Sequence, residues 1–151
     1  IADSYSVFLV EVGGELRAQG HKPNGDSWRI AVESPVAGVR NIQKVINVDD
    51  TAIATSGDYR NYFEQDGVRY SHTIDPLTGK PIRHRLASVT ILDPSCARAD
   101  ALATAMMVLG EEKGLALAKA LKLPAFFIVK QDEGFVELYT PEFEPFFDAV
   151  R

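Results

Sequence analysis

Short apolar runs separated by turn residues fill the first half of the chain. Gly13-Gly14 supplies the positive φ angles of a tight connection, and Asp66-Gly67 is a strong hairpin signal. The last run alternates and puts Val68, Tyr70, His72 and Ile74 on one strand face. We expect strands at residues 7–12, 15–19, 28–33, 42–48, 51–55, 59–65 and 68–74.

The second half has a different pattern. After a strand at 86–92, the segments 97–109 and 111–121 have helical composition and are separated by Gly110. Thr104 is the only polar residue between Ala101 and Leu109, so the first helix should be buried. We expect two more strands at 125–130 and 134–139, followed by an aromatic tail that packs against the fold (Phe143, Phe146 and Phe147).

Strands grouped first and helices later favour an α+β fold with a largely antiparallel sheet and two consecutive helices in the second half. The chain has 151 residues, of which 46% are hydrophobic, and this is typical of one domain, 1–151. It begins at Ile1 within a strand-like pattern rather than at Met, so we expect a processed or truncated product.

Charge and cysteine content exclude several classes of protein. There are 16 basic and 21 acidic residues, which give a net charge of −5, and no basic run follows a phosphate backbone. We therefore expect no nucleic-acid partner. Cys96 is the only cysteine, so no internal disulfide can form. The longest apolar stretch, 99–110, is too short to span a bilayer.

Asp100 and Thr104 are four residues apart, so a helix places a carboxylate and a hydroxyl on one face. Oxygen ligands suit Mg²⁺, which is often held by one or two protein groups together with substrate phosphates. A structural interpretation stays open at this point. Asp100 could cap the first helical turn or pair with Arg98 or Arg85, while Thr104 bonds back to a backbone carbonyl.

His72 precedes a turn that extends from Asp75 to Gly79. An imidazole can take a proton from an alcohol, as phosphoryl transfer to a hydroxyl requires. The alternative is a hydrogen-bonded histidine in the core. Turn chemistry alone explains Asp75 to Gly79.

Two glycine-bearing segments could contact a ligand. Gly13 and Gly14 could let backbone amides approach a phosphate, although a hairpin needs them anyway. The segment Ser56, Gly57, Asp58 and Tyr59 could present donors, an acceptor and a ring, or it could be an ordinary strand exit.

Four segments, spread in order over about two thirds of the chain, resemble the ApbE family of FAD:protein FMN transferases. They are Val10–Glu15, Ala54–Tyr59, His72–Gly79 and Ala99–Thr104. The resemblance covers the C-terminal half of the family, whose members are roughly twice this long; their N-terminal half carries a lipoprotein signal and part of the flavin pocket.

The resemblance implies a transferase that cleaves FAD between its phosphates, moves FMN to a threonine or serine hydroxyl of an acceptor protein, and releases AMP. It implies Mg²⁺ held by Asp100 and Thr104, His72 assisting deprotonation of the acceptor hydroxyl, and a flavin site that includes Asp58 and Tyr59. The chemistry suggested by the residues themselves involves the same positions.

The resemblance also implies a periplasmic protein, anchored to the inner membrane by a lipid on its N-terminal part, whose acceptors are flavin-carrying subunits of redox complexes. Two other functions stay open. One is a Mg²⁺-dependent pyrophosphatase that splits FAD into FMN and AMP, and the other is a non-catalytic flavin-binding fragment.

Overall fold

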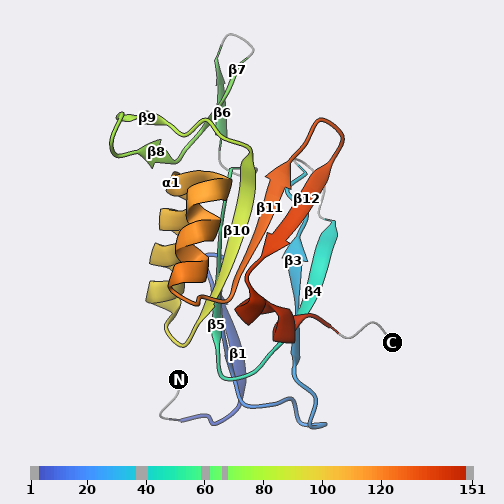
Figure 1. Ribbon diagram of the computed structural model, residues 1–151. Helices are drawn as coiled ribbons and strands as arrows, with labels where there is room; N and C mark the ends of the chain where they lie inside the picture. Colours follow the sequence, from blue (N-terminus) through green and yellow to red (C-terminus); the bar gives the residue numbers. More distant parts are fainter. Residues whose placement is uncertain (1–3, 37–40, 59–61, 66–67, 149–151) are drawn as a thin grey trace.

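A six-stranded antiparallel sheet forms the centre of the computed structural model, which describes residues 4–36, 41–58, 62–65 and 68–148 (Figure 1). The strand order is β1-β2-β5-β10-β11-β12. All five pairings are antiparallel, as the hairpin signals predicted. The strands are β1 (Phe8–Val12), β2 (Glu15–Gln19), β5 (Ala52–Gly57), β10 (Leu86–Asp93), β11 (Ala125–Lys130) and β12 (Phe135–Tyr139).

The sheet is covered on both faces, with α1 (Cys96–Ala120) on one side. The hairpin of β3 (Trp28–Glu33) and β4 (Ile42–Val48) packs on the other side together with the 3-10 helix η1 (Pro141–Phe146). Every residue of β10 is buried, because this strand lies at the centre of the sheet between the two layers. Five of its eight residues are apolar, and the polar residues Ser88, Thr90 and Asp93 are buried with them.

The aromatic tail packs against the fold as predicted. Phe143 is fully buried, and its ring stacks on Phe126 of β11 at a centroid distance of 5.4 Å. The Phe147 ring meets both of these rings, approximately edge to face.

The two predicted helical segments form one element, α1, whose backbone leaves helical geometry at Gly110 (φ 79°, ψ −179°). The expectation that the first segment is buried all round was wrong. Met106 and Met107 are buried, but Ala101, Thr104 and Ala105 are exposed. Alanine raises the apolar content of a helix without requiring burial, so composition overstated how much of α1 is covered. Among the described residues, no helix is long and apolar enough to cross a membrane.

The predicted strand at 68–74 is also wrong in its last residues. β7 (Val68–Ser71) pairs with β6 (Tyr62–Gln65) and ends before His72, which is exposed rather than on an apolar strand face. A separate short pair, β8 (Ile74–Asp75) and β9 (Lys80–Pro81), then follows around the predicted turn. Within that turn the Asp75 carboxylate accepts hydrogen bonds from the Leu77 amide and the Thr78 hydroxyl.

Candidate functional site

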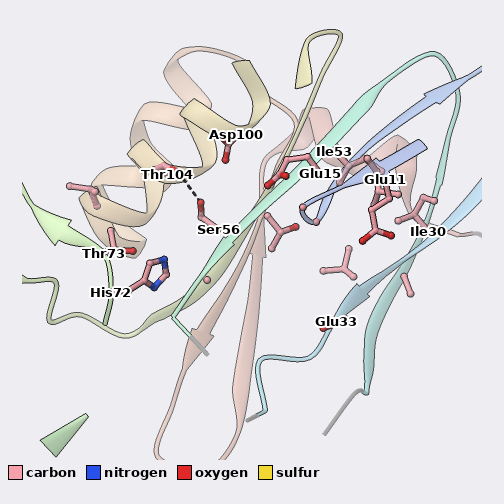
Figure 2. A pocket seen from close by; sticks show the side chains of 18 of the residues that line it. Glu11, Glu15, Ile30, Glu33, Ile53, Ser56, His72, Thr73, Asp100 and Thr104 are labelled. Atoms are coloured by element: carbon pink, nitrogen blue, oxygen red, sulfur yellow. Dashed lines mark hydrogen bonds between the residues drawn. The ribbon is translucent and has the colours of Figure 1, made fainter. Parts of the chain in front are cut away.

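A pocket of about 610 Å³ opens where five segments meet, and its size lies within the range typical of small-molecule sites (Figure 2). The segments are the β1–β2 turn, the second half of β3, the far end of β5, residues 72–74, and the first half of α1. Residues predicted from separate parts of the sequence therefore come together in one place.

The open end of β5 creates this space. β10 pairs with β5 as far as Gly57, whereas β2 pairs with it only at Ala52 and Ile53. Beyond Ile53 the two strands diverge, and the chain turns at Gly13 (φ 70°) and Gly14 (φ 109°) beside the pocket. A Cβ atom on Gly14 would have no atom within 4 Å, so the backbone there is open to an approaching group.

Asp100 and Thr104 lie one turn apart on α1, and both side chains line the pocket (Figure 2). The structural alternative for Asp100 is overturned by its neighbours. Ser95 caps the helix through the Arg98 amide, and the Arg98 side chain pairs with Asp93 at 3.1 Å. Asp100 makes no hydrogen bond or ion pair with any described residue. Its exposed carboxylate is thus available to a ligand.

Ser56 reaches the same place from the sheet. Its Oγ atom lies 3.1 Å from Oγ1 of Thr104, and the hydrogen bond joins β5 to α1 across the pocket wall (Figure 2). The alternative in which Thr104 bonds back to its own helix is not what the structure has, because its hydroxyl bonds Ser56 instead.

His72 lines the pocket on the side of the 72–74 segment (Figure 2). The segment is fixed on both sides of the histidine. The Thr73 amide donates to the hydroxyl of the buried Ser71, and the Thr73 carbonyl accepts from the Ile82 amide at 3.0 Å. These bonds turn the chain out of β7 and direct residue 72 to the pocket.

The charges that line the pocket are all acidic among the described residues. Glu11, Glu15 and Glu33 join Asp100, and no lysine or arginine lines the pocket. Sequence reasoning missed the three glutamates. Two of them flank the Gly13-Gly14 turn, which was a local signal, but Glu33 lines the pocket only because β3 crosses the far face of the sheet.

These donors fit a magnesium ion better than a transition metal. No cluster of three or more His, Cys, Asp or Glu side chains that could hold a metal occurs in the described part of the chain. A single carboxylate and a hydroxyl, both oxygen donors, suit an ion that keeps water and binds substrate phosphates. The donor set is therefore compatible with Mg²⁺.

The remaining predicted residues divide into three cases. Gly57 lines the pocket beside Ser56. Asp58 is not among the lining residues, and its carboxylate pairs with Lys130 at the end of β11. Tyr59 lies outside the described residues.

Cys96, at the start of α1, lies close to the acidic wall of the pocket, which here means Glu15 and Asp100. Burial raises the pKa of its thiol, Glu15 and Asp100 raise it further, and Arg17 opposes them. The thiol donates to the Leu16 carbonyl, so Cys96 is a neutral group beside the site.

Comparison with known proteins gives the family. The model of the ApbE family matches residues 2–127. The chain belongs to the ApbE family. An FAD:protein FMN transferase from Vibrio cholerae is 57% identical over 139 residues, which are 92% of this chain and 42% of that protein. One from Haemophilus influenzae is 47% identical over 85% of this chain and 38% of that protein.

Solved ApbE structures show the same fold. The flavin transferase ApbE from Vibrio cholerae matches with a TM-score of 0.84 at 51% identity, covering 97% of this chain and 46% of that one. The apo form of the Pseudomonas stutzeri flavinyl transferase ApbE matches with a TM-score of 0.79 at 55% identity, over 95% and 44%. The chain spans less than half the length of these ApbE relatives.

Proposed function

We propose that the protein acts in FAD:protein FMN transfer, moving FMN from FAD to a serine or threonine hydroxyl of an acceptor protein and releasing AMP. The observation that carries this proposal is the placement of His72, Asp100 and Thr104 on the walls of one pocket. Its relatives from Vibrio cholerae and Haemophilus influenzae are named FAD:protein FMN transferases, which supports the same reaction.

Electrostatics support a cation requirement. A pyrophosphate carries negative charge, and the described residues that line this pocket contribute four carboxylates and no lysine or arginine. Repulsion would disfavour FAD unless a cation is bound with it. Asp100 and Thr104 would hold the ion, and when bound there Mg²⁺ supplies positive charge that neutralises the pyrophosphate.

The residues of the chain would handle the acceptor and its proton. The acceptor hydroxyl oxygen forms a bond to the phosphorus of the FMN half, and the bond from that phosphorus to the bridging oxygen breaks. The AMP half leaves with the bridging oxygen. A nitrogen of His72 takes the hydroxyl proton as the new bond forms. The rigid segment around His72 would hold the imidazole where this transfer can occur.

The acceptor and the location belong to the same proposal. The acceptor would be a flavin-carrying subunit of a redox complex, and the enzyme would work in the periplasm with a lipid anchor on a part of the protein outside this sequence.

The test is direct. The protein is incubated with FAD, MgCl₂ and the membrane proteins of the cells that encode it, and the mixture is denatured and separated by size. Covalent flavin appears as a fluorescent band, and AMP is measured in the same reaction. We expect both products, both abolished by EDTA, and both lost with Asp100→Asn.

Asp132→Asn is the matched control, because it removes an exposed carboxylate in the turn between β11 and β12, away from the residues that line the pocket. It should keep full activity. AMP released at the same rate without acceptor, and with no flavin band, would instead indicate FAD hydrolysis. If neither covalent flavin nor AMP is formed by the wild type or by any variant, the protein binds flavin without catalysing the reaction.

A further inference from the structure

The hydrogen bond between Ser56 and Thr104 connects two rigid elements at the point where a cation would bind. Ser56 lies in β5, where its backbone is paired with Val89 of β10. Thr104 lies in α1, 48 residues further along the chain. Because both backbones are fixed, the contact of 3.1 Å fixes the two side chains relative to each other.

A threonine on a helix has two accessible χ1 rotamers, one of which turns the hydroxyl back to its own helix. The bond to Ser56 selects an orientation that places Oγ1 of Thr104 at the pocket wall, on the same side of α1 as the Asp100 carboxylate (Figure 2). Without Ser56, Thr104 is free to return to the carbonyl one turn earlier.

The hydroxyl proton matters as much as the rotamer. A hydroxyl binds a cation through a lone pair, so its proton has to point elsewhere, to an acceptor. The Ser56 oxygen is such an acceptor, and accepting this proton leaves the lone pairs of Thr104 available to a cation. In this arrangement Ser56 acts through Thr104 and needs no contact of its own with the cation or the flavin.

We propose that Ser56 is a positioning residue that holds Thr104 in its cation-binding orientation. The inference rests on the proposed cation site at Asp100 and Thr104. The sequence suggested instead that Ser56 contacts the flavin directly. The two roles can be distinguished, because a positioning role predicts a loss of cation affinity and direct contact predicts a loss of FAD affinity.

The experiment measures Mn²⁺ affinity by electron paramagnetic resonance in the presence of FAD, and FAD affinity separately in EDTA. Ser56→Ala should weaken Mn²⁺ binding about tenfold, the lower end of what loss of an outer-shell partner costs a metal site. FAD affinity in EDTA should not change. Ser56→Thr keeps a hydroxyl and should retain most of the Mn²⁺ affinity, which controls for altered packing.

A double-mutant cycle tests whether Ser56 acts through Thr104. In a Thr104→Ala background, Ser56→Ala should have no further effect on Mn²⁺ affinity. An equal effect in both backgrounds, or a tenfold loss of FAD affinity in EDTA, would overturn the inference in favour of direct contact. Unchanged Mn²⁺ affinity in Ser56→Ala would overturn it as well. Ser27→Ala, which removes a hydroxyl bonded to Asp49 outside the pocket lining, should behave like the wild type.

Asp100→Asn separates this inference from the proposed function. If it lowers Mn²⁺ affinity and Ser56→Ala does not, only the role of Ser56 is wrong. If Asp100→Asn binds Mn²⁺ as the wild type does, the proposed cation site itself fails.

Discussion

The Nε2 atom of His84 lies 2.7 Å from the carbonyl oxygen of Met107, at the end of the first helical segment of α1. A carbonyl only accepts, so Nε2 carries the proton and satisfies one of the carbonyls that a helix end leaves without a partner. The ring of His84 also lies against Gly110, where the helix breaks.

Gly110→Ala should destabilise the protein. Gly110 has a φ of 79° and a ψ of −179°, a conformation that only glycine adopts readily, and a Cβ atom would lie 3.0 Å from Cδ2 of His84. We expect a loss of about 1–3 kcal/mol from backbone strain, with a further loss from the clash. Urea denaturation measures it. Gly25→Ala is the control, because Gly25 has a φ of 82° but open space around it. Equal losses for the two variants would contradict a role for the contact with His84.

Asp100→Asn and Thr104→Val should separate activity from stability. Both residues are exposed, so each substitution should change the free energy of unfolding by less than about 0.5 kcal/mol. Mg²⁺-dependent AMP release should fall by about 100-fold or more, because Asp100→Asn removes the negative charge that attracts the ion and Thr104→Val removes the hydroxyl oxygen. Measuring the melting temperature and AMP release on the same samples checks both expectations. Unaltered turnover would refute the metal assignment.

His72→Ala should slow flavin transfer and leave FAD binding mostly intact, because in the proposed reaction the imidazole would act on the proton of the acceptor hydroxyl. Loss of a general base typically lowers the rate by about 10²–10⁴-fold. Rates of flavin transfer and FAD dissociation constants, measured side by side, test this. If FAD affinity falls by the same factor as the rate, His72 positions the flavin instead.

Cys96 should react slowly with iodoacetamide at neutral pH. Burial and the nearby Glu15 carboxylate raise the pKa of its thiol, so less of the reactive thiolate is present than in an exposed cysteine. The alkylation rate should rise with pH, with a midpoint above that of a cysteine in a short peptide measured in parallel. A midpoint at or below that of the peptide would show that the acidic wall does not influence the thiol.

Local signals predicted most of the fold. The Gly13-Gly14 turn predicted the first hairpin, and the strand predicted at 86–92 is β10. The end of β7 was missed for a specific reason. The alternation of apolar residues continues to Ile74 on both sides of His72. The strand nevertheless ends at Ser71, because the Ser71 hydroxyl accepts a hydrogen bond from the Thr73 amide and turns the chain away.

The sequence could predict those parts of the candidate site whose residues lie close together along the chain. Asp100 and Thr104 share a helix face, so their spacing alone placed them together. The contact of Thr104 with Ser56 and the presence of Glu33 in the pocket depend on how α1 and β3 pack on the sheet. The spacing of residues along the sequence does not predict that packing.

The measurement that tests the central claim most directly is a titration of FAD with and without Mg²⁺, on the wild type and on Asp100→Asn. We predict that Mg²⁺ strengthens FAD binding to the wild type and has no effect on the variant, because in the proposed site Asp100 would hold the ion at the acidic pocket. Enhancement of the same size in both proteins would contradict the account, and so would FAD binding to the wild type that does not depend on Mg²⁺.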